Sequence, residues 1–231
     1  MIMNSLLNPP GGAPKAPLNL STHSILDAQT AEVKHFDPPT PPDLLLMVDI
    51  ESLSLGARPV ITQVALLGYD LQEDELLETR HVQYYPIEPQ LQLIPPRRIM
   101  ASTIAWWMKQ SDDARARFEY STSDDFEDLR ALARGLIATF NQLTRNGTLN
   151  YELVAKHPQF DVVALETLLD ELGFVKPWAH DRVFDLATQL KSAGVNGKNV
   201  AKPAGFIPHV AFWDSRWQIA QYLEAKKALA G

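Results

Sequence analysis

The sequence predicts an α/β domain in which a mixed β-sheet carries α-helices on its faces. Three strand-like segments come first, at 44–50, 60–69 and 81–85, and their short connections suit antiparallel pairing. Helix-like segments then alternate with two more strand-like segments, at 149–155 and 182–186. This order indicates one mixed sheet with helices packed against it.

The first two strands stand out by their apolar content. Residues 44–48 read Leu-Leu-Leu-Met-Val, which is typical of a buried strand. The second segment contributes Ile61, Val64, Ala65, Leu66 and Leu67. Between them, 52–59 contains Gly56 and Pro59 and is expected to be a loop.

The helices are identified by amphipathic spacing and by the residues at their ends. The longest is predicted at 124–145, with Thr122 and Ser123 as caps and Asn146-Gly147 as its end. Its apolar stripe consists of Phe126, Leu129, Leu132, Leu136, Ile137, Phe140 and Leu143. Further helices are expected at 103–110, 112–118, 161–172 (with Gly173 as its stop), 187–192 and 212–228.

Residues 1–42 are expected to form an arm outside the domain, which then occupies 43–231. Eight of the 17 prolines fall in this arm: Pro9, Pro10, Pro14, Pro17, Pro38, Pro39, Pro41 and Pro42. That density excludes a central strand or a long helix. We expect an extended or partly disordered arm, with room for a short helix near 22–33, and with a protein partner as an option.

Composition limits the class of protein. The 231 residues are 45% hydrophobic and include no cysteine, which excludes disulfides and thiolate zinc sites. The formal net charge of −7 argues against a protein that coats nucleic acid through phosphate contacts, but not against an enzyme that holds a few nucleotides through metal ions. No apolar stretch reaches membrane-span length and no secretory signal is evident, so we expect a cytoplasmic protein.

Asp49 and Glu51 end the first strand-like segment. Residues two apart on a strand share a face, so the two carboxylates are expected side by side at the end of a buried strand. Such a pair is costly unless a cation lies between them, and a divalent metal ion suits oxygen ligands. The pattern recurs at Asp125 and Glu127, where it suits the first turn of a helix instead. For Asp49, a metal site and a chance occurrence both remain open at this point.

Three later positions complete a set. Asp161 opens a helix after a strand, so its carboxylate is expected to point toward the first strand. His209 and Asp214 precede and begin the last helix. The same His-x4-Asp spacing occurs at His180 and Asp185. That copy overlaps a predicted strand and follows closely on the preceding helix, so we favour His209 and interpret Asp185 as a helix cap or a buried hydrogen-bond partner.

Such a set suits phosphodiester hydrolysis. Two divalent ions about 4 Å apart can hold the attacking and leaving oxygens. Several carboxylates are needed to hold such ions. A neutral imidazole nearby can take the proton of the attacking water, because its pKa lies near neutrality.

The order Asp-Ile-Glu, Phe-Asp at a helix start and His-x4-Asp before a C-terminal helix resembles the DEDDh 3′–5′ exonucleases, which have an RNase H-like fold. Segments 60–65 and 103–110 are similar to a bacterial and phage branch of 3′–5′ exoribonuclease-like proteins. The resemblance covers about residues 43–225. It implies Mg²⁺ or Mn²⁺, two ions in all, and a histidine general base, His209. The implied metal ligands are Asp49, Glu51, Asp161 and Asp214.

The resemblance also implies the reaction. We expect a metal-dependent exonuclease that hydrolyses single-stranded RNA or DNA from its 3′ end and releases nucleoside 5′-monophosphates. The alternative is a catalytically silent module that binds nucleic acid or protein on the same scaffold. A homodimer is common in this group and is therefore an option.

Several other residues are candidates for substrate contacts. Residues 156–159, Lys-His-Pro-Gln, depart from the small residues common in this branch, so Lys156 or His157 either contacts phosphate or lies in a solvated loop. Trp106 and Trp107 face different ways on a helix, so one is expected in the core and the other in a groove or subunit contact, with base stacking as an option. Candidate phosphate contacts, with a solvated surface as the alternative, are Arg97, Arg98, Lys109, Arg115 and Arg117.

Overall fold

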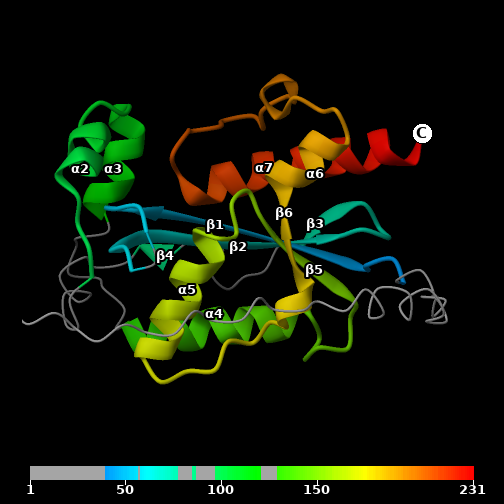
Figure 1. The fold of residues 1–231 in the computed structure, drawn as a ribbon, viewed down its shortest axis with the longest axis horizontal. Helices are drawn as coiled ribbons and strands as arrows, with labels where there is room; N and C mark the ends of the chain where they lie inside the picture. The colour runs from blue at the N-terminus through cyan, green and yellow to red at the C-terminus, as the bar shows by residue number, and fades with distance from the viewer. Residues whose placement is uncertain (1–39, 57, 78–84, 87–96, 121–128) are drawn as a thin grey trace, which may run out of the picture. The chain divides into compact units, whose positions relative to one another are not determined.

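A mixed β-sheet lies between two layers of helices (Figure 1). Its strands follow the order β3-β2-β1-β5-β6, and β4 also pairs with β2. β1 pairs antiparallel with β2, whereas β1 with β5 and β5 with β6 are parallel. The strands are β1 (Leu44–Ser52), β2 (Ile61–Asp70), β3 (Glu75–Leu77), β4 (Tyr85–Pro86), β5 (Tyr151–Ala155) and β6 (Val183–Asp185). The predicted mixed sheet with flanking helices is confirmed.

This computed structural model describes residues 40–56, 58–77, 85–86, 97–120 and 129–231. Nearly all of the predicted arm lies outside these residues, so the boundary at 42/43 stays a prediction. Most of the strand expected at 81–85 and the start of the helix expected at 124–145 also lie outside them. β3 was not predicted; it pairs with the end of β2 across a turn in which the Asp70 side chain accepts hydrogen bonds from the backbone of Gln72 and Glu73.

The helices divide between the two faces of the sheet. α4 and α5 cover one face, α6 and α7 cover the other, and α2 and α3 lie beyond the end of the sheet (Figure 1). They are α2 (Ala101–Trp107), α3 (Asp112–Tyr120), α4 (Leu129–Leu143), α5 (Asp161–Glu171), α6 (Leu186–Ser192) and α7 (Ala211–Ala230). Gly173 ends α5 as predicted, with a left-handed φ of 75°. Among the described helices, none combines the length and the apolar character needed to cross a membrane.

The side chains of β1 alternate between the two faces. The even-numbered set packs against α4 and α5 in the larger core: Leu44, Leu46, Val48 and Ile50. The odd-numbered set begins with Leu45 and Met47, which pack against α6 and α7. Because the period of a strand is two, Asp49 and Glu51 continue the odd-numbered set and face α7. The carboxylates therefore extend one face of a buried strand into the space before α7.

β1 is longer than its parallel neighbour β5, and the difference opens a notch at the end of the sheet. The two strands pair only from Leu44 to Met47 on β1. β5 ends at Ala155, and the chain then turns into α5. Crevices outside the carboxyl ends of parallel strands are common ligand sites in α/β sheets. The notch lies beside Asp49 and Glu51.

Arg97 is fixed inside the protein rather than on a phosphate-binding surface. It is 6% exposed, pairs with Glu171 at 2.8 Å, and donates from Nη1 to the carbonyl oxygen of Pro59. Its interpretation as a phosphate contact is therefore wrong. Arg115 donates to carbonyl oxygens just after α2 and pairs with Asp112, so it joins α2 to α3. The remaining candidates are Arg98 and Lys109, which are exposed, and Arg117, whose side chain lies outside the described part.

Trp107 attaches α2 to the end of β1. Its side chain is 4% exposed, and its Nε1–H donates a 2.9 Å hydrogen bond to the carbonyl oxygen of Ser52. Trp107→Phe removes this donor and shrinks a buried ring, so we expect the free energy of unfolding to fall by about 1–3 kcal/mol. Urea denaturation measures the change. Trp106→Phe, at the exposed neighbour, is the control and should cost less; equal losses for the two variants would contradict this role.

Candidate active site

Asp49 and Glu51 present two carboxylates from β1 at one side of a cavity. Oδ1 of Asp49 accepts a 2.8 Å hydrogen bond from Nε2 of Gln218, on α7. Burial is the largest cause that raises the pKa of both carboxyls well above the ordinary range. Like charges on Asp161 and Asp214 raise both pKa values further. The two β1 carboxylates therefore resist ionising together with their neighbours.

Asp161 reaches the same place from the start of α5. Its side chain is 6% exposed, and its Oδ1 accepts a 3.3 Å hydrogen bond from the backbone N–H of Ile50. Ile50 lies beyond the last β1–β5 pair, so the carboxylate occupies the edge that β5 leaves open. Burial raises the pKa of Asp161 to about 7. The Asp161 carboxyl thus accepts its hydrogen bond from the residue that separates Asp49 and Glu51 in β1.

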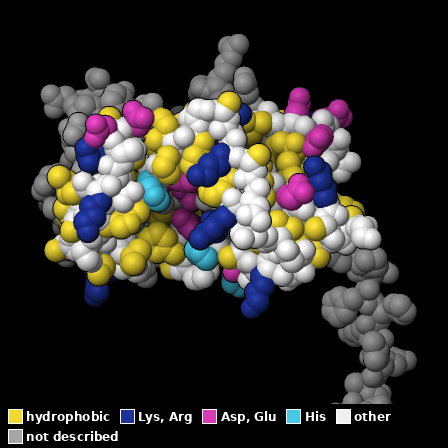
Figure 2. All heavy atoms as spheres, turned by 90° about the horizontal axis from the view of Figure 1, so that it is seen from above, with side chains coloured by type: hydrophobic (Ala, Val, Ile, Leu, Met, Phe, Trp, Pro, Cys, Tyr) yellow, Lys and Arg dark blue, Asp and Glu magenta, His cyan; other side chains and the backbone are white. Residues whose placement is uncertain are grey.

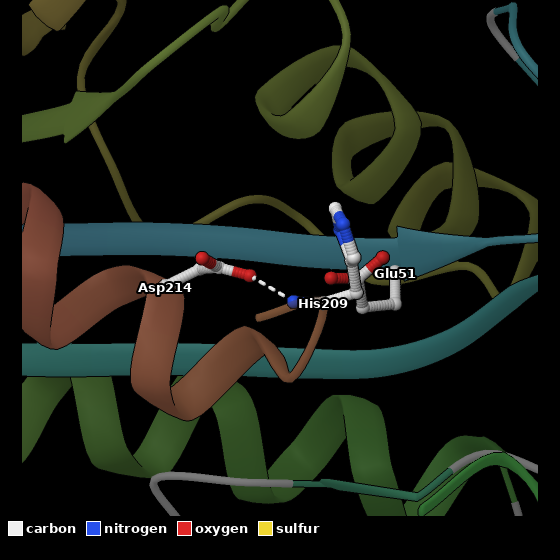
Figure 3. A group of neighbouring side chains, drawn as sticks. All are labelled: Glu51, His209 and Asp214. Carbon is white, nitrogen blue, oxygen red and sulfur yellow. Dashed lines mark hydrogen bonds between the residues drawn. The ribbon is translucent and has the colours of Figure 1, made fainter. Parts of the chain in front are cut away.

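His209 and Asp214 come from the entry to α7. Oδ2 of Asp214 accepts a 2.8 Å hydrogen bond from the backbone N–H of His209 (Figure 3). His209 has a φ of 62°, a conformation that costs free energy for a non-glycine residue, and the Asp214 carboxylate stabilises it. Burial raises the pKa of Asp214 to about 6 and lowers that of His209. The imidazole is therefore neutral at neutral pH.

The other His-x4-Asp pair has a different role. His180 begins a 3₁₀ turn, His180–Arg182, and is exposed. Asp185 caps α6 by accepting hydrogen bonds from the backbone of Ala187 and the hydroxyl of Thr188. Asp185 is thus a helix cap, one of the roles expected for it.

The five side chains line one cavity of about 720 Å³. Figure 2 shows Asp and Glu side chains at the bottom of a hollow with Lys, Arg and His side chains around it. Within the described residues, ligand atoms of Glu51, His209 and Asp214 all lie within 4.8 Å of one another. This group includes His209, which the sequence assigned to proton transfer rather than to metal binding. Asp49 and Asp161 line the same cavity but are not in that group.

The donor set fits hard divalent cations. Carboxylate oxygens are the ligands that Mg²⁺ and Mn²⁺ prefer. Four carboxyls whose pKa values are all raised would be stabilised in their ionised form by bound cations. The cavity therefore has the chemistry of a metal site, in which protons and metal ions compete for the same oxygens.

An apolar wall adjoins the carboxylates. A second cavity of about 460 Å³ shares Ile50, Glu51, Leu55 and Phe160 with the first and continues to Trp106 and the start of α2. Trp106 is 41% exposed, and its ring centre lies 4.6 Å from that of His209. The prediction that one tryptophan of the pair is core and the other part of a groove is confirmed.

Comparison with known proteins shows the family of this chain. Residues 45–225 match the family described as the 3′-5′ exoribonuclease Rv2179c-like domain. The chain belongs to this family. Membership agrees with the 3′–5′ exonuclease that the motifs predicted, and it favours an enzyme over a silent module. The DEDDh exonucleases, which the motifs resemble, generally use divalent metal ions.

Solved structures support an RNase H-like fold for this chain. Similar ones are the ExoI/SSB-Ct complex (TM-score 0.52, 14% identity, 82% of this chain and 42% of that chain) and the nuclease domain of 3′hExo, a DEDDh family member, bound to rAMP (0.50, 13%, 84% and 96%). Exonuclease I in complex with inhibitor BCBP is also similar, with a TM-score of 0.51 and 15% identity over 81% of this chain and 42% of that chain. The chain thus spans less than half of the exonuclease I chains. A search of curated proteins finds no significant match.

Several residues of the candidate site were missed in the sequence. Gln218 lies four residues after Asp214 on α7, so the two share a helix face, and this spacing was the available signal. Lys202, Phe206 and Trp217 also line the carboxylate cavity. Lys202 and Phe206 lie in the loop before α7, and no periodic pattern identifies such positions.

Gln218 is expected to position Asp49 for metal binding. It is 4% exposed, and Gln218→Leu removes the hydrogen bond to Asp49 while keeping a similar volume. Loss of a group that orients a ligand typically weakens metal affinity about 10–100-fold. We expect the Mn²⁺ concentration for half-maximal activity to rise accordingly. Gln221→Leu, at a buried residue of α7 that bonds Gly197, is the matched control; equal metal dependence in both variants would refute the role.

Acid should stabilise the metal-free protein. The pKa values of Asp161, about 7, and Asp214, about 6, lie above their ordinary value of 3.8. From the ordinary pKa of 3.8 up to the raised pKa values, the folded protein binds more protons than the unfolded chain. The free energy of unfolding therefore falls as pH rises from about 4 to about 7. Thermal unfolding with a chelator at pH 5 to 8 should show a higher Tm at the acid end. Asp161→Asn should weaken the dependence of Tm on pH. An unchanged dependence in that variant would contradict the raised pKa of Asp161.

Proposed function

We propose that this site releases nucleoside 5′-monophosphates one at a time from the 3′ end of single-stranded RNA or DNA. The observation that carries the proposal is the meeting of four carboxyls with raised pKa values and one neutral imidazole in a single cavity. Family membership supports the polarity and the type of bond. The choice between RNA and DNA rests on contacts with the 2′-hydroxyl.

The carboxylates of Asp49, Glu51, Asp161 and Asp214 would hold two Mg²⁺ or Mn²⁺ ions. When bound, such ions make water a better nucleophile and stabilise charge on the phosphate. His209 takes the proton of the attacking water as general base, because burial keeps its imidazole neutral. Its ring is fixed by the edge of Trp106, and its backbone by Asp214.

The apolar cavity beside Glu51 takes the 3′-terminal nucleoside. Trp106, Leu55 and Phe160 give it aromatic and aliphatic walls, on which a base can stack without sequence preference. Stacking of this kind contributes about 1–3 kcal/mol per base. An unpaired terminal base can leave its stack to contact these walls, which favours single strands.

Single-residue variants test the assignment on 5′-labelled RNA and DNA with Mn²⁺. We expect wild type to shorten the strands from the 3′ end, and Asp49→Ala or a chelator to abolish the ladder. His209→Ala should reduce the rate about 10²–10⁴-fold, the usual contribution of a general base. His180→Ala, in the other His-x4-Asp pair, is the matched control and should keep full activity. A ladder that persists in Asp49→Ala and His209→Ala would contradict the site.

A further inference from the structure

A cluster of two lysines and two aromatic rings lines only the larger cavity. Its residues are Lys156, after β5, Lys202 and Phe206, in the loop before α7, and Trp217, on α7. None of the four lines the apolar cavity that contains Trp106. We call this group the lysine–tryptophan cluster. The two cavities meet at Glu51 and Phe160, so the groove has a cationic part and an apolar part.

The aromatic rings hold both ammonium groups beside the carboxylates. Nζ of Lys202 lies 4.7 Å from the ring centre of Phe206 and 5.1 Å from that of Trp217, and Nζ of Lys156 lies 5.6 Å from that of Trp217. Trp217 is itself fixed, because its Nε1–H donates a 3.0 Å hydrogen bond to the carbonyl oxygen of Val200. Cation–π contacts orient a lysine without neutralising it.

The two lysines remain available to an anionic ligand. Both act on Asp214 by lowering its pKa, so their charges lie close to the carboxylates. The ion pairs found among the described residues involve Arg58, Arg97, Arg115 and Lys176, and neither lysine of the cluster takes part. A phosphate that enters the cavity therefore meets two ammonium groups that no carboxylate has already paired.

The cationic and apolar parts of the groove suit different parts of a single strand. A 3′-terminal nucleoside brings only the phosphate that is cleaved, whereas each nucleotide on its 5′ side adds another phosphate. The apolar part suits the terminal nucleoside, and the cationic part suits the strand that leads to it. We propose that Lys156 and Lys202 bind phosphates on the 5′ side of the cleaved bond, with Trp217 and Phe206 as their platform. This inference rests on the proposed exonuclease function and adds that oligonucleotides, rather than short phosphodiesters, are the preferred substrates.

The test compares two substrates with the Lys156→Met/Lys202→Met double variant. One is a single-stranded octanucleotide; the other is a p-nitrophenyl ester of a nucleoside 5′-monophosphate, which has a terminal nucleoside and a phosphodiester but no 5′ strand. We expect KM for the octanucleotide to rise at least about tenfold, with kcat and the KM for the ester nearly unchanged. In a plot of log binding constant against log salt concentration, the slope for the octanucleotide should become shallower by about 0.7 for each lost phosphate contact. The Lys156→Arg/Lys202→Arg variant keeps both charges and is the matched control.

Other outcomes would overturn the proposal. An unchanged KM for the octanucleotide would mean that the lysines contact no phosphate. Equal losses of kcat on both substrates would place them at the reacting phosphate instead. A wild-type protein that hydrolyses neither substrate would refute the proposed function. Fluorescence anisotropy of the octanucleotide with Mg²⁺, in a His209→Ala background, measures binding by the lysines separately from nuclease activity. Equal Kd and equal salt dependence with and without the two lysines would refute the inference whatever the turnover.

Discussion

Repulsion among four carboxyls, one of them buried and three partly buried, is the constraint around which the end of the sheet is organised. Two come from β1 and the other two from the first turns of α5 and α7, and burial makes ionisation of every one costly. One oxygen each of Asp49, Asp161 and Asp214 accepts a hydrogen bond from an N–H group. The donors are Gln218, Ile50 and His209, respectively. These hydrogen bonds fix the directions of the carboxylates but do not cancel their charge. Divalent cations would supply the missing charge.

The fold creates this meeting through strand length and helix entry. β1 extends beyond β5, so its final residues have an unpaired edge. There the Asp161 carboxylate accepts a hydrogen bond from the backbone of Ile50. α7 enters through a strained residue, His209, whose conformation depends on Asp214. One carboxylate thus serves both the backbone and the site. The apolar wall at Trp106 and the lysine–tryptophan cluster then give the groove two chemically different parts.

Sequence reasoning found the elements whose signals are local. The apolar run before Asp49, the helix that starts at Asp161 and the His-x4-Asp spacing before the last helix identified the strand, the helix and the loop that carry the site residues. β3 was missed because three residues carry no periodic pattern. Arg97 was misassigned because its partner, Glu171, is far away in the chain. The spacing of Gln218 from Asp214 places both on one face of α7 but does not show that this face packs beside Asp49. Trp217 has no such local signal, because its partner Val200 lies in the loop before α7.

The most direct test of the cation requirement is anomalous scattering from crystals soaked in Mn²⁺. We expect strong Mn²⁺ peaks among the carboxylates of Asp49, Glu51, Asp161 and Asp214, and their loss in Asp161→Asn crystals. Crystals with no Mn²⁺ peak between β1 and the first turn of α7, or with peaks only on exposed acidic residues elsewhere, would contradict it.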